Sequence, residues 1–174
     1  MLAGTEPTRL RRTREDILEE QIRNPRRHET ITLNVGNQCE EIDIEIAPLI
    51  REIWVASIET MMSCQEVSPG IAWIEFPEVE ELLRFLNIVT RYEPEADTLY
   101  NRICHQVVGP TSRPHWEYQF NVWDMFQGQE EQQHDGEVNF FATVGVYFPT
   151  AEITLLIERL RVFNSVKGSA ELMD

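Results

Sequence analysis

The chain has 174 residues, 42% of them hydrophobic and 26% charged, and its formal net charge at pH 7 is −15. This length and composition are typical of one globular domain that folds without a disulfide or a structural metal ion. A body this acidic repels phosphate backbones, so we expect no nucleic-acid partner. No run of eighteen apolar residues occurs, so we expect no membrane partner either.

The cysteines narrow the class of protein further. Cys39, Cys64 and Cys104 are odd in number and show no C-x-x-C spacing, which excludes a disulfide framework and a zinc ribbon. Free thiols are the default in a reducing cytosol. No apolar segment follows the basic residues near the start of the chain, so no signal peptide is expected. We therefore expect a cytoplasmic protein.

Charge divides the chain into an arm, a domain and a tail. Residues 1–27 contain seven arginines and five acidic residues, whereas residues 28–174 contain eight basic and 25 acidic residues. The first segment shows little apolar periodicity, although Thr13 could begin a short helix. We predict a flexible Arg-rich arm over residues 1–27, a single α+β domain over 28–166 and a flexible tail over 167–174.

The domain is predicted to begin with a strand and a helix. Apolar and polar residues alternate from Thr30 to Val35, which is typical of a strand, and Gly36-Asn37 follows as a turn. The acidic run from Glu40 to Glu45 precedes apolar residues at helical spacing up to Trp54. Because acidic side chains favour the positive end of a helix dipole, we predict that this run opens a helix.

Two strands and two helices are predicted next. Ile58 to Gln65 and Ile71 to Phe76 have the composition of strands, and Ser68-Pro69-Gly70 between them favours a hairpin. Pro77 opens a helix with leucines and valines at helical spacing, and a further helix is predicted from Pro94 to Val107.

The second half shows the same order of elements. Alternating aromatic and polar residues predict a strand from His115 to Met125, and a polar, acidic loop follows over residues 127–137. A partner strand is predicted from Val138 to Phe148, and Pro149 opens the last helix.

A short pattern recurs in the two halves. Phe76-Pro77 and Phe148-Pro149 each end a strand, and Glu80 and Glu152 each follow the proline by three residues at the start of a helix. Duplication of an αββα unit and independent selection of helix caps both explain this pattern. The predicted fold class is α+β, with a four- to five-stranded, mostly antiparallel sheet and helices packed on one face.

The opposite face of that sheet is predicted to mix polar and aromatic side chains. Its expected members are Glu117, Gln119, Asn121 and Tyr147, joined by Trp73, Glu75 and Phe141. Such a face can be solvated, can form a subunit interface, or can be the floor of a binding site.

The span from Ile42 to Phe76 resembles uncharacterised small bacterial and phage proteins. In these, a helix with the pattern PLI..LW leads to a GI.T..SCQG strand and an AYI.F strand, and this chain matches through Pro48-Leu49-Ile50, Ser63-Cys64-Gln65 and Ala72 to Phe76. It departs from the pattern at two glycines, where Ser57 and Glu66 stand. The resemblance supports the fold and implies no activity.

A weaker similarity links this region to the wybutosine-synthesis methyltransferase family, in which a strand ends in a T.SSCSGR segment. Only Ser63-Cys64 is kept here, with Gln65-Glu66 in place of the following Ser-Gly and no matching arginine. That resemblance would imply RNA modification, which suits an acidic body poorly.

Cys64 is the candidate nucleophile of the chain. A reactive thiolate needs a nearby histidine, an arginine or a helix N-terminus, and His115 could meet Cys64 if the two hairpins pair. Ser63, Gln65 and Trp73 would then line a ligand site. Acidic neighbours such as Glu66 would raise the thiol pKa, so a structural cysteine is the alternative.

Other chemistry has less support in the sequence. Glu75 and Glu117 could pair across the sheet as an acid and a base, or bind a ligand. No set of three or four ligands has a recognisable metal-binding spacing, and no nucleotide-binding motif is present, so we expect no metal and no cofactor.

Two functions therefore remain open. The first is a protein-interaction or self-association domain, with a homodimer held by the Arg-rich arm on the acidic body or by the mixed sheet face. The second is a small enzyme or ligand-binding protein with its site around Ser63, Cys64 and Gln65.

Overall fold

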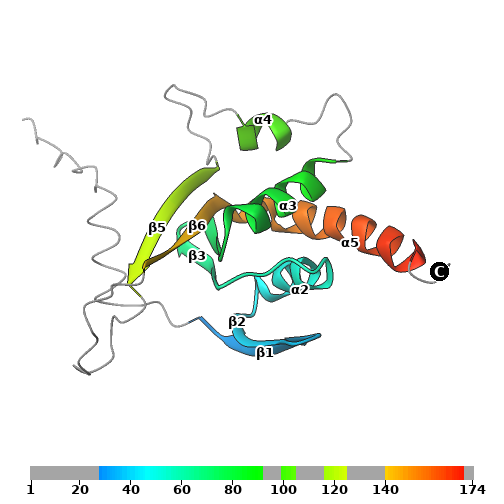
Figure 1. Ribbon diagram of the computed structural model, residues 1–174, viewed down its shortest axis with the longest axis horizontal. Coiled ribbons are helices and arrows are strands. Elements are labelled where there is room, and N and C mark those ends of the chain that lie inside the picture. The colour runs from blue at the N-terminus through cyan, green and yellow to red at the C-terminus, as the bar shows by residue number, and fades with distance from the viewer. Residues whose placement is uncertain (1–27, 92–98, 105–115, 125–139, 171–174) are drawn as a thin grey trace, which may run out of the picture.

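A computed structural model describes residues 28–91, 99–104, 116–124 and 140–170 of the chain. Two antiparallel sheets and a layer of helices make up this part of the protein (Figure 1). The elements are β1 (Thr30–Val35), β2 (Gln38–Asp43), α2 (Ala47–Val55), β3 (Met62–Ser68), β4 (Ile71–Phe76), α3 (Val79–Thr90), α4 (Leu99–Cys104), β5 (Glu117–Asp124), β6 (Phe140–Pro149), the 3-10 turn η1 (Thr150–Glu152) and α5 (Ile153–Ala170).

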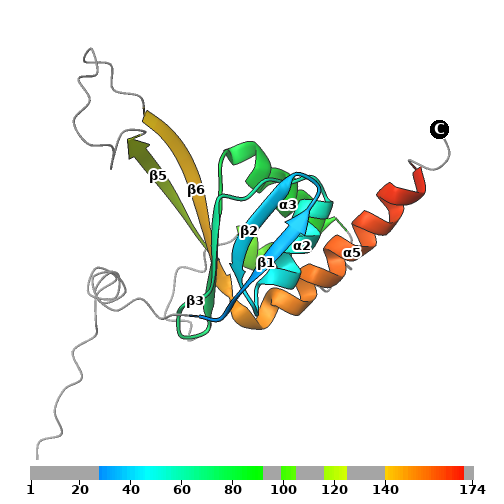
Figure 2. The same cartoon turned by 90° about the horizontal axis from the view of Figure 1, so that it is seen from below.

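The main sheet has four antiparallel strands in the order β3-β4-β6-β5, and β1 and β2 form a separate two-stranded hairpin. Helices α2, α3 and α5 lie on the same side of the four strands in both views (Figures 1 and 2). The α+β class, the antiparallel pairing and the helices on one face are therefore confirmed. The element order α2-β3-β4-α3 recurs as α4-β5-β6-α5, while common ancestry of the two halves stays a prediction.

Alternation along the strands directs one set of side chains into the core. Ile74 and Phe76 of β4 and Val146 and Phe148 of β6 are fully buried beneath the helices. Four aromatic rings continue this core from strand to helix, with Phe85 lying between Phe76 and Trp116, and Trp116 stacking on Phe148. The burial of so many large side chains is the main stabilising term of the fold.

Polar contacts fix α5 against the other helices. The guanidinium of Arg159, almost fully buried, donates a 2.6 Å hydrogen bond to the carbonyl of Val89 at the end of α3. Glu52 of α2 accepts hydrogen bonds from Arg161 and Asn164 of α5. The carbonyl of Val89 has no acceptor role left within α3, so Arg159 satisfies a group that burial would otherwise penalise.

The structure corrects the prediction for the acidic run. Gln38 to Asp43 form strand β2 and not a helix, and Gly36 at the turn has a φ of 58°. The left-handed backbone at a two-residue turn suits a tight hairpin, and once the turn forms, the acidic segment pairs along β1. Ile46 then precedes α2, which begins at Ala47 with proline in its first turn.

The observed ends of other elements differ from the predicted ends by a few residues. Strand β3 begins at Met62, four residues later than Ile58, whose side chain is buried in the preceding connection. Ser57, where the resembling family has glycine, has a φ of 61°, a left-handed conformation that glycine adopts at lower cost. Helix α5 reaches Ala170, inside the segment for which a flexible tail was predicted.

Several predictions lie outside the described residues. These are the Arg-rich arm over residues 1–27, the loop over 127–137 and the ends of the helix expected around α4. Among the helices that the structure describes, none is long and apolar enough to cross a membrane.

Candidate functional site

Cys64 lies where the regular pairing of strand β3 ends. It is the register partner of Trp73, and the next pair is Ser68 with Ile71. Between these two pairs, strand β3 therefore contains three residues, Gln65 to Val67, whereas β4 contains only Ala72. Such a bulge bends the strand and releases backbone groups from the ladder, so they become available to other partners.

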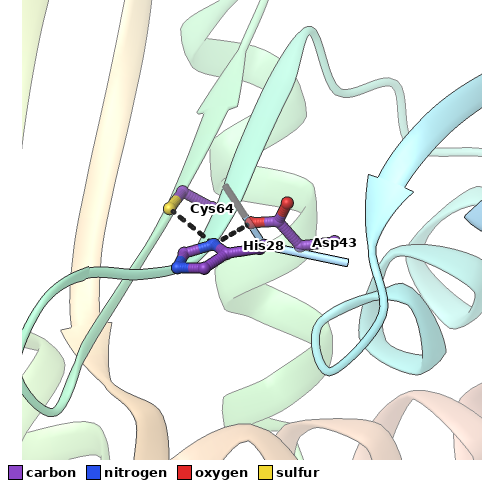
Figure 3. A group of neighbouring side chains, drawn as sticks. All are labelled: His28, Asp43 and Cys64. Carbon is purple, nitrogen blue, oxygen red and sulfur yellow. Dashed lines mark hydrogen bonds and ion pairs between the residues drawn. The ribbon is translucent and has the colours of Figure 1, made fainter. Parts of the chain in front are cut away.

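The open end of the β1–β2 hairpin brings two further side chains to Cys64. Thr30 pairs with Asp43, so His28, two residues before β1, lies beside that aspartate. The Nδ1 atom of His28 is 2.8 Å from Oδ2 of Asp43 and 3.8 Å from Sγ of Cys64 (Figure 3). Three segments that are distant in sequence thus place a nitrogen, an oxygen and a sulfur within 4.8 Å of one another.

The aspartate of this cluster is held from a second direction. Its Oδ2 atom accepts a hydrogen bond of 3.1 Å from the backbone N–H of Gln65, one of the groups that the bulge releases. The side-chain oxygen of Gln65 accepts the backbone N–H of Glu45 at 2.8 Å. Because both hydrogen bonds cross from β3 to the segment around Asp43, they fix the hairpin against the sheet edge.

The cluster does not have the geometry of a nucleophilic triad. In a Cys-His-Asp triad, one ring nitrogen of the histidine faces the nucleophile and the other faces the carboxylate. Here Nδ1 of His28 makes the contacts with both Asp43 and Cys64, and the second nitrogen lies on the side of the ring away from Asp43 (Figure 3). One nitrogen cannot donate its proton to the carboxylate and accept the thiol proton at the same time.

The environment of Cys64 also opposes a reactive thiolate. Burial raises the pKa of its thiol, the charges of Asp43 and Glu66 raise it further, and a hydrogen bond from the backbone of Glu66 lowers it only in part. A raised pKa leaves less thiolate at neutral pH, and the thiolate is the attacking species.

The rate of alkylation measures how much reactive thiolate each cysteine forms. At neutral pH, iodoacetamide is expected to label Cys64 more slowly than Cys39, whose side chain is exposed. The Cys64 rate should rise about tenfold per pH unit below its pKa, because the thiolate fraction rises in that proportion. Peptide mass spectrometry of the folded protein gives both rates, and faster labelling of Cys64 than of Cys39 would instead show an activated nucleophile.

Only part of the predicted ligand site comes together. Trp73 is beside Cys64 as its register partner, and Gln65 contacts the segment around Asp43. Ser63 is the partner of Ile74, so it faces the core side of the sheet, away from Cys64. His115 lies outside the described residues.

The two carboxylates that were expected to pair are apart. Glu75 aligns with Gly145 of β6, whereas Glu117 aligns with Tyr147, so one strand and two register positions separate them. Strand geometry makes this roughly 12 Å between Cα atoms, too far for a shared proton. Glu75 is fully buried and accepts hydrogen bonds from Asn121 and Thr143, a structural role that joins three strands.

A second feature is the exposed end of the β5–β6 hairpin. Phe120, Val122 and Phe140 belong to the side of these strands that continues into the core, yet 65%, 62% and 67% of their surfaces are exposed. We call these three residues the hairpin patch. Strands β5 and β6 extend beyond the helices (Figure 2), and the exposure of the three patch residues indicates that the apolar face of this hairpin continues without cover from the helix layer.

Comparison with known proteins gives one weak relative. The chain is 32% identical over 92 residues to an uncharacterised protein of Acanthamoeba polyphaga mimivirus, and the match covers 51% of this chain. The chain spans about half the length of that relative, with 46% of it matched. No family model and no solved structure matches. The similarity to a viral protein of unassigned activity leaves the resemblance to bacterial and phage proteins a prediction.

Proposed function

We propose that this chain is a self-association domain that pairs with a second copy through strand β5 and the hairpin patch. The observation that carries the proposal is the exposure of Phe120, Val122 and Phe140, three large apolar side chains on one sheet face. Burying each of them in an interface would contribute roughly 1.5–3 kcal/mol. Contiguous exposed apolar surface of this kind commonly marks an interaction site.

A second copy fits this surface because the middle of β5, at one edge of the main sheet, carries no charge. The strand order ends in β5, and no described strand pairs with its outer side. From Tyr118 to Trp123 the sequence YQFNVW contains no charge, whereas the whole chain carries −15. The centre of such a contact therefore adds no like charges to the two acidic bodies, and an antiparallel pair of edges satisfies a two-fold axis.

The Val122→Glu variant tests the proposal. It places a charge in the hairpin patch, and it should raise the dimer dissociation constant at least about tenfold, which is roughly 1.4 kcal/mol. Val166→Glu on α5 is the matched control, because Val166 is 58% exposed and Val122 is 62% exposed. Both variants change the net charge equally, so sedimentation equilibrium at several concentrations isolates the effect of position.

Two further measurements separate the outcomes. Added salt should strengthen the wild-type dimer, because it screens repulsion between two acidic bodies. Deletion of residues 1–27 should leave the association unchanged if β5 forms the contact, whereas a dimer held by the Arg-rich arm would dissociate. A wild-type chain that stays monomeric at high concentration, or equal weakening by both glutamate variants, would refute pairing through β5.

A ligand-binding function around Cys64 is the second candidate, favoured by the convergence of His28, Asp43 and Cys64. Cys39 and Cys64 are free thiols, which supports a cytoplasmic location.

A further inference from the structure

We propose that one divalent transition-metal ion binds between Nδ1 of His28, Oδ2 of Asp43 and Sγ of Cys64. The types of these donor atoms favour zinc. The site lies between the β1–β2 hairpin and the edge strand β3, outside the proposed interface on β5. Imidazole nitrogen, thiolate sulfur and carboxylate oxygen are the three protein donors that zinc uses. A single water or substrate molecule would complete four-coordination, as in zinc sites with three protein ligands.

Two of the three donor distances are near those of a tetrahedral ion, and all three donor atoms lie within 4.8 Å of one another. Zinc bond lengths imply roughly 3.4–3.6 Å between neighbouring donors in a tetrahedron. The nitrogen–sulfur distance is 3.8 Å, close to that value, and the nitrogen–oxygen distance is 2.8 Å, a hydrogen bond or ion pair that must lengthen by roughly 0.6 Å.

The orientation of His28 is the strongest argument for a metal over a nucleophile. Its Nδ1 faces both other donors, which is required of a metal ligand and excluded for a catalytic base held by Asp43. With zinc bound, the proton would move to the other ring nitrogen, which lies on the side of the ring away from Asp43 (Figure 3).

The surroundings favour a preorganised site. The side chains of His28 and Asp43 are only 14% and 16% exposed, so the ion would be largely shielded from water. The backbone N–H of Gln65 already holds the aspartate oxygen at 3.1 Å, a supporting contact of the kind that orients metal ligands.

The ion would clamp two separate sheets together. His28 and Asp43 belong to the ends of the β1–β2 hairpin, and Cys64 belongs to the four-stranded sheet. Because these sheets share no strand, a bond to a common ion would tie them directly, and zinc would raise the thermal unfolding midpoint of the protein.

Cobalt titration of the full, metal-stripped chain tests the site. We expect one Co²⁺ per chain, with tetrahedral d–d absorption and a thiolate-to-cobalt charge-transfer band, and displacement by Zn²⁺. Cys64→Ser and His28→Ala should each weaken cobalt binding at least about 100-fold. Cys39→Ser is the matched control, because Cys39 is a free, exposed thiol on the β1–β2 hairpin that carries His28 and Asp43, and this variant should bind cobalt as the wild type does.

A second readout uses the unaltered protein, in case a variant fails to fold. Stoichiometric Zn²⁺ should protect Cys64 from iodoacetamide and leave Cys39 labelling unchanged. The proposal is overturned if wild-type cobalt binding does not saturate, if the charge-transfer band survives in folded Cys64→Ser, or if Zn²⁺ leaves the labelling of Cys64 unaffected.

Discussion

Trp116→Ala is expected to lower the free energy of unfolding by about 3–5 kcal/mol. Trp116 is 1% exposed, and its ring stacks on Phe148 with centroids 5.2 Å apart. On its other side it contacts Phe85, at 6.4 Å between centroids. Truncation leaves a cavity between Phe148 of β6 and Phe85 of α3 that these rigid rings cannot fill, so both transfer and cavity costs apply.

Trp116→Phe separates the packing of the ring from its hydrogen bond. The indole N–H donates a 2.7 Å bond to Glu152, whose other oxygen accepts a bond from Arg102. The phenylalanine variant keeps an aromatic ring but loses this charge-assisted bond, at a cost of about 1.5–3 kcal/mol. Urea unfolding followed by circular dichroism, at one fixed protein concentration, gives the free energy of unfolding of the wild type and of both variants. A loss below about 1 kcal/mol for Trp116→Ala would contradict the described packing.

Most strands of the main sheet could be predicted because their two faces differ in polarity. The alternation of Trp116, Tyr118 and Phe120 with polar residues fixes which side chains face the helices, and the register confirms it through Val144 and Val146. The pattern also predicted the opposite face correctly. It could not predict that the helix layer ends before the strands do, and this limit leaves the hairpin patch exposed.

The acidic run shows where local patterns fail. Glu40 and Glu41 suit a helix start as well as an exposed strand, and only the turn at Gly36-Asn37 decides between them. A two-residue turn at that position pairs Thr30 with Asp43, so the hairpin itself could have been derived from the sequence. In the structure, Thr30 and Thr32 both donate hydrogen bonds to Glu41, a cross-strand contact that lowers the pKa of this carboxyl.

Only part of the candidate site could be predicted from the sequence. Cys64 at a strand end was recognised, and the hairpin register would have placed His28 beside Asp43. The contact between that hairpin and β3 depends on the bulge after Cys64, which releases the N–H of Gln65 toward Asp43. The position of a bulge depends on tertiary contacts, and the polarity pattern of Gln65 to Val67 does not predict one there.

The proposed metal and the proposed interface use opposite edges of one sheet. Strand β3 carries Cys64 and strand β5 carries the hairpin patch, with β4 and β6 between them. Substitutions at one edge should therefore leave the other intact, and additive effects are expected for sites this far apart. Loss of dimerisation in Val122→Glu and retention of cobalt binding in the same variant would establish that independence.

Gly145→Ala is expected to lower the free energy of unfolding by about 1–3 kcal/mol, although alanine normally suits a strand better than glycine. A Cβ atom at Gly145 would lie 2.7 Å from Nε1 of Trp73, which no ordinary contact allows. The indole cannot retreat freely, because its ring packs against Tyr147 with centroids 6.2 Å apart. The free-energy cost of overpacking therefore exceeds the stabilisation of about 0.5–1 kcal/mol that comes from replacing a flexible glycine.

A double-mutant cycle with Trp73→Ala tests whether the clash is the cause. In the Trp73→Ala background the space over Gly145 is open, so Gly145→Ala should become neutral or stabilising by up to about 1 kcal/mol. The coupling energy between the two positions should then be at least about 1.5 kcal/mol. If Gly145→Ala costs the same with and without the indole, the backbone of β6 and not Trp73 requires glycine, because β6 pairs on both sides at this position, with Glu75 and with Gln119.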